Sequence, residues 1–279
     1  MIACENTLIR ASACHYHWSG AAGYSLKRFS SGNAYYRFDG LRRRVDPSHF
    51  LLLNVGQPYE LDIDSSVPVA SHCLFFSTQL VQDIFCDLTT AETSKLDSPD
   101  GHSSAMFVPR LYLLDDELLL RLRAFESQEL DGQDSSPMLR EERFRLLAVK
   151  LVERSLARAR AECRIKALKS STREEVYRRV GNARDVIISH WEKPLRLEEI
   201  ARASSLSPNH LLRSFRAVYR TTPGRFQQSL RMNAAARKLI SSKLSVARVA
   251  GDCGFKSVTS FSQLFRRYFG MSPRDYRKR

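Results

Sequence analysis

The sequence of 279 residues lacks the marks of a secreted, zinc-binding or membrane-spanning protein. Its six cysteines form no Cys-x-x-Cys pair and no spacing typical of zinc ligands, so we expect reduced, mostly buried thiols in a cytoplasmic protein. Residues 1–18 carry Glu5, Arg10 and two histidines where a signal peptide has an apolar core. No stretch approaches the roughly 18 apolar residues of a membrane helix, so we expect no membrane partner.

Catalytic signatures are also missing. The chain has no G-x-S-x-G elbow, no glycine-rich phosphate loop and no pair of carboxylates in a plausible setting. His49 and His72 stand alone, and an isolated histidine is more often an ordinary polar residue than a ligand or a base. The sequence therefore predicts neither an enzyme nor a cofactor, and it indicates no catalytic or metal-binding residue.

The positive charge is concentrated at one end of the chain. The sequence holds 44 Lys and Arg against 30 Asp and Glu, and residues 173–279 hold 23 of the former and 8 of the latter. The other 172 residues are nearly neutral, with 21 basic and 22 acidic side chains. A compact basic segment typically binds a polyanion, namely DNA, RNA or an acidic membrane surface. A solvated basic surface without a partner is the alternative that charge alone leaves open.

The first 110 or so residues favour strands. Runs rich in β-branched and aromatic residues occupy 35–45, 50–63 and 67–76. Turn residues punctuate them at 46–47, 56–58 and 65–66. This pattern predicts a small β-barrel or sandwich. The polar, turn-rich segment 89–104 is expected to be a mobile loop.

Two helices are expected next, at 115–130 and at about 139–165. In the second, apolar residues keep the spacing of a single stripe: Phe144, Leu147, Leu151, Val152, Leu156 and Ala159. The short connection 131–137 favours an antiparallel pair. The pair either covers the sheet or forms a dimer interface, and the pattern does not separate the two. The polar segment 166–175 is expected to be the domain boundary.

A helix-turn-helix pattern begins at Leu197 in LEEIARASSLSPNHLLRSF. Apolar or small residues stand where two short helices and their turn would meet, at Ile200, Ala201, Leu206, Leu211 and Phe215. Ser207-Pro208 fits the N-cap and first residue of the second helix, because proline lacks the N–H that would be unsatisfied there.

The same pattern returns in VARVAGDCGFKSVTSFSQLF. Val249-Ala250 and Gly254-Phe255 repeat Ile200-Ala201 and Ser205-Leu206 at an offset of 49, and Phe261 and Phe265 repeat Leu211 and Phe215 at an offset of 50. Each unit ends with a Thr-Pro or Ser-Pro pair that can cap a following helix, at 222–223 and 272–273.

Residues 222–242, between the two units, form a good helix pattern with Phe226, Leu230, Ala234 and Leu239 on or near one face. About 20 residues at 1.5 Å give roughly 30 Å. One turn of B-DNA is about 34 Å, so a rod of this length can place two recognition helices in successive major grooves.

Residues from about Arg179 to Arg279 resemble the DNA-binding domain of the AraC/XylS family of bacterial transcription regulators. The most specific match is VARVAGDCGFKSVTSFSQLFRRYFGMSPRDYR, which is similar to the C-terminal signature of that family. The first unit departs from the family at Ser205 and Arg220, where glycine is common. We therefore expect slight strain in the first turn.

The resemblance implies which side chains contact DNA. Base contacts are implied for Asn209, His210, Leu212 and Arg213 in the first recognition helix and for Val258, Thr259, Ser262 and Gln263 in the second. Arg can pair with guanine and Asn or Gln with adenine, while Leu, Val and the Thr methyl group can meet thymine methyl groups. Phosphate contacts are implied for Arg216, Arg266 and Arg267. A solvent-facing residue without a DNA contact is the alternative at each position.

The resemblance also implies an N-terminal cupin-like barrel that senses a small-molecule effector and dimerises. A cupin metal site needs a His-x-His, a following Glu and a later His, whereas His15 and His17 lack the Glu and precede the expected barrel strands. Effector-binding residues are unknown: the aromatic and aliphatic candidates could line a pocket or be core, and they are Phe38, Leu53, Tyr59, Phe75 and Phe76.

These observations predict an α+β protein with a cupin-like effector-sensing and dimerisation domain at 1–168, including a helical dimerisation pair, and an AraC-type DNA-binding domain at 174–279. Its helix-turn-helix units are expected at about 197–219 and 246–269. We expect a homodimeric, sequence-specific regulator of double-stranded DNA, with RNA polymerase as a partner if it is an activator. The alternatives are a cupin-type enzyme or DNA-repair protein fused to the same domain, and a structural nucleoid protein.

Overall fold

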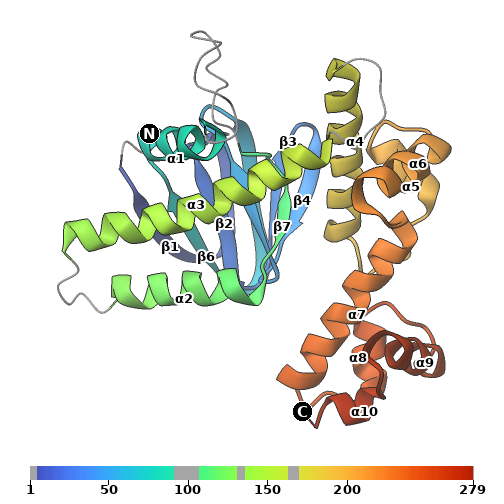
Figure 1. Ribbon diagram of the computed structural model, residues 1–279. Helices are drawn as coiled ribbons and strands as arrows, with labels where there is room; N and C mark the ends of the chain where they lie inside the picture. Colours follow the sequence, from blue (N-terminus) through green and yellow to red (C-terminus); the bar gives the residue numbers. More distant parts are fainter. Residues whose placement is uncertain (1–4, 91–106, 131–135, 163–169, 279) are drawn as a thin grey trace. The chain divides into compact units, whose positions relative to one another are not determined.

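The computed structural model describes residues 5–90, 107–130, 136–162 and 170–278 (Figure 1). The chain divides into two compact units, 1–163 and 164–279. Each unit has its own packed interior, and each is described by itself.

The first unit is built on seven antiparallel strands in the order β4-β3-β6-β2-β5-β7, with β1 on the other side of β6. The strands are β1 (Thr7–Ala21), β2 (Ser25–Ser31), β3 (Ala34–Phe38), β4 (Leu41–Val45), β5 (His49–Leu53), β6 (Pro58–Phe75) and β7 (Leu111–Leu113). Strand β6 pairs with β3 along its first half, with β2 along its second half and with β1 along both halves. The register of β1 and β6 shifts between Ala13 and His15, where residues 65–68 of β6 lie opposite one residue of β1, so the long pair can bend, and the strands form a nearly closed barrel.

Two details of the strand prediction are wrong. The Ser65-Ser66 pair does not end a strand, because β6 continues through it to Phe75. His15 and His17 do not precede the barrel but lie within β1. Strand β1 could not be predicted from the sequence because it has no alternation of apolar and polar residues. It pairs with β6 alone, and its side chains are exposed or half-buried.

Three helices pack on one face of this sheet: α1 (Thr78–Thr90), α2 (Asp116–Leu130) and α3 (Pro137–Glu162) (Figure 1). Their shared core joins residues of β2, β5 and β6 to all three helices, as in Leu26, Phe50, Leu74, Val81, Ile84, Leu122, Phe125, Phe144 and Leu151. The predicted helices at 115–130 and 139–165 are confirmed within the described residues, and the apolar stripe of α3 faces the sheet. Helix α1 was not predicted, and residues 91–104 of the expected loop lie outside the described residues.

The second unit is entirely helical. Its helices are α4 (Ser170–Ser189), α5 (Leu197–Ala203), α6 (Pro208–Tyr219), α7 (Pro223–Ser241), α8 (Val246–Asp252), α9 (Val258–Phe269) and α10 (Pro273–Tyr276). Helix α4 packs on α5, α6 and α7, while α7 also contacts α8 and α10. Residues 170–175, expected at the domain boundary, form the start of α4, and residues 163–169 lie outside the described part of the chain.

The helix starts in this unit follow the predicted chemistry. Ser207, Thr222 and Ser272 are N-caps whose hydroxyl oxygens accept hydrogen bonds from the backbone N–H groups three residues later. In each case a proline occupies the first helical turn. Helix positions are therefore fixed locally by a few side chains, which is why they could be read from the sequence.

The two departures from glycine fall on left-handed backbone positions. Ser205 and Arg220 have φ of 56° and 57°, and their equivalents in the second unit, Gly254 and Gly270, have φ of 78° and 77°. A side chain in this region costs roughly 1–2 kcal/mol, because Cβ approaches the following carbonyl oxygen. The expected strain in the first turn is thus located at Ser205.

Replacing Ser205 with glycine should raise the free energy of unfolding by about 1 kcal/mol, because the strain is relieved at a position whose side chain is exposed. Urea unfolding measures the change. Gly254→Ala is the matched control and should destabilise by about 2–4 kcal/mol, since a Cβ there would overlap the carbonyl oxygen of Glu192. A destabilised Ser205→Gly variant would contradict the assignment of strain.

Candidate nucleic-acid interface

Helices α6 and α9 each have a buried face and an exposed polar face. The buried faces carry Leu211 and Phe215 in α6 and Phe261 and Phe265 in α9, all with no exposed surface. These buried side chains hold each helix in its own helix-turn-helix unit, so the opposite face of the helix is exposed to solvent. Both helices follow a tight turn from a shorter helix, α5 or α8.

The exposed face of α6 carries the predicted residues of the first unit. Asn209, Arg213 and Arg216 are exposed, while His210 and Leu212 are half-buried. The three exposed residues are spaced by four and then three positions, which places them on one side of the helix. No ion pair or hydrogen bond joins the Arg213 or Arg216 side chain to another described residue, so both guanidinium groups are free to bind a ligand.

The exposed face of α9 carries the predicted residues of the second unit. Val258, Thr259 and Gln263 are exposed, and Ser262 is half-buried. Arg266 and Arg267 follow in the last turn and are also exposed. The two recognition faces therefore share their geometry but differ in chemistry: a guanidinium group at Arg213 is replaced by a carboxamide at Gln263.

A half-buried joint on α7 connects the end of α4 to the second helix-turn-helix unit. The Arg231 guanidinium group donates hydrogen bonds to the carbonyl oxygens of Trp191 (2.7 Å), Glu192 (3.3 Å) and Gly254 (3.2 Å). The first two follow the C-terminus of α4, and Gly254 forms the turn of the second unit. Gln227, one turn earlier, donates to the carbonyl oxygens of Trp191 and Lys193. Helix α7 is thus hydrogen-bonded both to the end of α4 and to the turn before α9.

The environment of Arg231 shows how tight this joint is. Burial lowers the pKa of Arg231, and the nearby Cys253 acts in the opposite direction. A Cβ at Gly254 would meet the Arg231 guanidinium carbon at 3.0 Å. Only glycine therefore fits the turn beneath the arginine.

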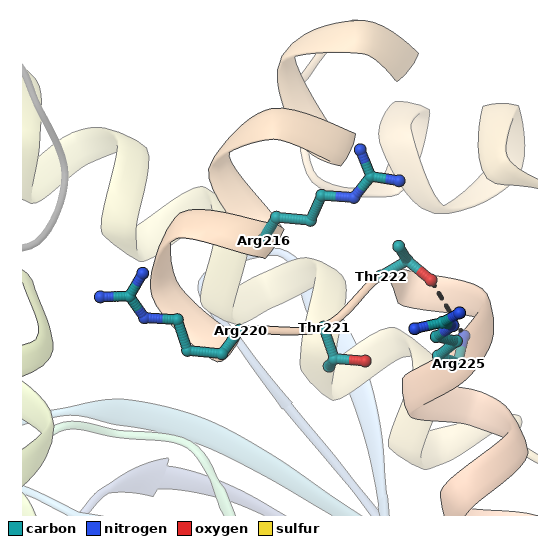
Figure 2. Close-up of a pocket in the computed structure, with 5 residues that line it drawn as sticks. All are labelled: Arg216, Arg220, Thr221, Thr222 and Arg225. Atoms are coloured by element: carbon teal, nitrogen blue, oxygen red, sulfur yellow. Dashed lines mark hydrogen bonds between the residues drawn. The ribbon is translucent and has the colours of Figure 1, made fainter.

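A basic pocket lies where α6 ends and α7 begins (Figure 2). It has a volume of about 400 Å³ and is lined by Arg216, Arg220, Thr221, Thr222 and Arg225. Of these residues, the sequence implied a DNA contact for Arg216 only. Arg220 stood out as a departure from glycine without an assigned role, and no local pattern indicates Arg225 or Arg231.

Four histidines in the described part of the first unit are engaged in polar pairs. His15 and His17 are exposed, and their Nδ1 atoms lie 3.1 Å from Asp64 Oδ1 and 2.7 Å from Asp62 Oδ1. His49 Nδ1 lies 2.8 Å from Asp46 Oδ1, and His72 Nδ1 lies 3.1 Å from Glu126 Oε1. Within the described ranges, no group of three or more His, Cys, Asp or Glu side chains is arranged to hold a metal ion.

The cysteines differ from the expectation. Of the four in the described part of the chain, Cys253 is buried, Cys14 and Cys73 are half-buried and Cys86 is exposed, and none of the four forms a disulfide. The prediction of mostly buried thiols is therefore wrong for these residues. Among the described helices, none is long and apolar enough to cross a membrane.

The candidate effector-binding residues are mostly core. Phe38, Leu53 and Phe76 are at most 3 % exposed, and Phe76 faces the helices. Tyr59 and Phe75 instead flank Lys27, whose ammonium nitrogen lies 5.7 Å and 3.9 Å from the two ring centroids. Lys27 is 2 % exposed, and no carboxylate or hydrogen-bond acceptor among the described residues pairs with it.

Known families match both units. An AraC-like ligand-binding domain matches residues 10–148, and a helix-turn-helix domain matches residues 200–279. The regulatory protein SoxS of Escherichia coli is 36% identical over 93 residues, which are 33% of this chain and 87% of SoxS. The transcriptional regulator GbdR of Pseudomonas aeruginosa is 37% identical over 90 residues, 32% of this chain, so the match spans about a quarter (24%) of GbdR.

A solved structure is also similar to part of this chain. A DNA-binding transcriptional dual regulator from Escherichia coli K-12 is 29% identical, with 36% of this chain and 89% of that chain covered and a TM-score of 0.33. The matched relatives are transcription regulators, and together the two family matches cover most of the chain. The protein therefore belongs to the AraC/XylS family of DNA-binding transcription regulators and combines an AraC-like ligand-binding domain with the helix-turn-helix domain of that family.

Proposed function

We propose that the protein is a sequence-specific regulator that reads two adjacent major-groove segments with α6 and α9. The observation that carries this proposal is the continuity of α7. This helix of 19 residues contacts α4 and α6 on the side of the first helix-turn-helix and α8 and α10 on the side of the second. At 1.5 Å per residue its length is about 28 Å, close to the roughly 34 Å of one DNA turn. Two recognition helices held by such a rod can enter successive major grooves on one side of a duplex.

Each recognition helix would read bases with the first two turns of its exposed face. In α6, Arg213 offers paired donors to guanine and Asn209 can pair with adenine, while Leu212 offers an apolar contact and His210 lies beside them. In α9, Gln263 can pair with adenine, the Thr259 methyl group and Val258 can contact thymine methyl groups, and Ser262 adds a hydroxyl. Because these two sets of residues differ, we infer that the DNA segments read by α6 and α9 differ in sequence.

The phosphate contacts would come from the C-terminal turns of the same helices. Arg216 in α6 and Arg266 and Arg267 in α9 are exposed and carry no ion pair within the described residues. Such contacts fix the register of the protein on the duplex but carry no sequence information.

Arg213→Ala tests base reading, and Arg266→Ala is its matched control. We expect Arg213→Ala to weaken binding by about 1–3 kcal/mol and to relax one position of duplexes that the wild-type protein selects from a random pool at about 150 mM salt. Arg266→Ala should weaken all sequences alike and reduce the salt dependence. Fluorescence anisotropy on selected and scrambled duplexes measures both effects. An equal loss on both duplexes for Arg213→Ala would refute its role as a base reader.

We propose that the first unit senses a small-molecule effector and dimerises. The outer surface of α2 and α3 carries exposed apolar side chains, Leu120, Met138, Leu139 and Leu146, which a second copy could cover. The effector would change how the DNA-binding units of a homodimer are presented. RNA polymerase is the further partner if the protein is an activator.

The barrel interior suggests the chemistry of that effector. Lys27 is buried among aromatic rings, and the Tyr36 hydroxyl is buried without a hydrogen-bond partner in the described structure. A buried ammonium group and an unpaired hydroxyl cost free energy unless something compensates them. An effector with an acidic group would supply the missing charge and acceptor.

Lys27→Met should raise the free energy of unfolding of the effector-free protein by about 1–2 kcal/mol, because an unpaired charge is replaced by an apolar chain of similar length. The same change should abolish thermal stabilisation by acidic compounds in a screen of metabolites. Thermal and urea unfolding measure both effects. A clear loss of stability in Lys27→Met would mean that the lysine is structural, and the acidic-effector proposal would fail.

A further inference from the structure

We propose that the junction of α6 and α7 is a dedicated binding site for one backbone phosphate of duplex DNA, formed by Arg216, Arg220 and Arg225. This inference rests on the proposed function and extends it beyond the two recognition helices. It adds Arg220 and Arg225, from the turn after α6 and the first turn of α7, to the phosphate contact already proposed for Arg216 in α6.

The charge of the pocket is the first argument. Its five lining residues include three arginines and two threonines, and none of the five is acidic. All three arginine side chains are exposed, and none forms an ion pair or a side-chain hydrogen bond with another described residue. Elsewhere in this unit arginines do find acidic partners, as Arg178 and Arg179 do at Glu175. Three unpaired guanidinium groups around one pocket repel each other and attract a phosphate group.

The backbone under the pocket is held firmly. The ring of Phe215 lies 4.7 Å from the ring of Tyr219 and 5.7 Å from that of Phe226, so aromatic contacts lock the end of α6 to the start of α7. The Thr222 hydroxyl caps α7 by accepting a hydrogen bond from the backbone N–H of Arg225 (Figure 2). The N-terminus of this 19-residue helix lies beside the same pocket, since Thr222 and Arg225 line it.

The guanidinium groups extend in different directions around this fixed turn (Figure 2). Long arginine side chains can swing toward a shared ligand while the backbone stays in place, because they have four rotatable bonds. A phosphate diester, with two charged oxygens, can accept hydrogen bonds from more than one guanidinium group at once.

The second repeat provides an internal comparison. At the equivalent positions 50 residues later stand Arg266, Gly270 and Asp275 in place of the three arginines. Asp275 accepts a hydrogen bond from the Ser272 hydroxyl at 2.5 Å and would repel a phosphate. The scaffold of the turn is shared, whereas the arginines at positions 220 and 225 have no arginine counterpart in the second unit. These two arginines are therefore not needed to build the turn.

A substitution at Arg220 separates an effect on DNA binding from an effect on stability. It occupies a left-handed position with φ of 57°, where its counterpart is Gly270. Arg220→Gly removes one charge from the pocket and suits the backbone better at the same time. Stability and DNA affinity should therefore change in opposite directions, and a loss of binding cannot be attributed to unfolding.

We would measure the affinity of the full-length wild type, Arg220→Gly, Arg225→Gln and the control Arg178→Gln for selected and random duplexes from about 50 to 300 mM salt. Each pocket variant should bind both duplexes roughly tenfold more weakly at the lower salt and should reduce the slope of log K against log salt by about one. Arg220→Gly should melt no lower than wild type. Arg178→Gln, which also removes one charge, should keep the wild-type slope.

Wild-type affinity and slope in both pocket variants, with discrimination between selected and random duplexes retained, would overturn the phosphate site and leave the proposed function standing. A wild-type protein without sequence preference would instead overturn the proposed function. Inorganic phosphate at constant ionic strength distinguishes a soluble ligand from DNA. If phosphate stabilises only the wild type while DNA binding is equal in all variants, the pocket serves a soluble phosphate compound and the DNA assignment fails.

Discussion

The hydrogen bonds from Arg231 to three backbone carbonyl groups are the constraint on which the DNA-binding unit depends. They join the end of α4, the rod helix α7 and the turn before α9 in one joint, and Gln227 adds two more bonds to the same segment. Carbonyl oxygens at a helix end need partners, and a planar guanidinium group can serve several of them at once. Because these hydrogen bonds tie the turn before α9 directly to α7, the orientation of α9 is set by α7 and not by a flexible linker.

The internal repeat shows how one scaffold can serve two chemical tasks. Caps, prolines, turn geometry and buried aromatic anchors are shared between the units, while the exposed positions differ. Arg213 corresponds to Gln263, and the basic turn after α6 corresponds to a turn with Gly270 and Asp275. Features that fold the unit are repeated, and of the proposed DNA contacts only the phosphate-contacting arginine, Arg216 and Arg266, recurs at an equivalent position.

Much of the C-terminal unit could be predicted from the sequence because its helix ends are defined locally. Ser207, Thr222 and Ser272 cap helices that begin with proline. A Ser-Pro or Thr-Pro pair before a helical pattern can be recognised in one sequence without its structure. Helix α4 also has apolar residues at helical spacing, Val176, Val180, Ala183 and Ile187, but its polar start has the composition of a linker.

The barrel and the DNA-contacting surface were harder to read for physical reasons. Strand β1 is exposed along most of its length, and β6 bends through serines that resemble a turn. The roles of Arg225 and Arg231 depend on segments far apart in the sequence, such as Trp191 and Gly254, which meet only in the folded unit. Residue spacing within one helix cannot predict contacts between segments that are this far apart in the sequence.

The most direct test of this account is a spacing series on a duplex that the wild-type protein selects. Base pairs are inserted one at a time, up to about ten, between the segments read by α6 and α9, and the affinity of the full-length protein is measured for each duplex. A rigid α7 of about 28 Å predicts that affinity falls to that of a duplex with a single segment after about five inserted pairs and does not recover at about ten. Unchanged affinity across the series would contradict the claim that Arg231 and α7 fix the two recognition helices relative to each other.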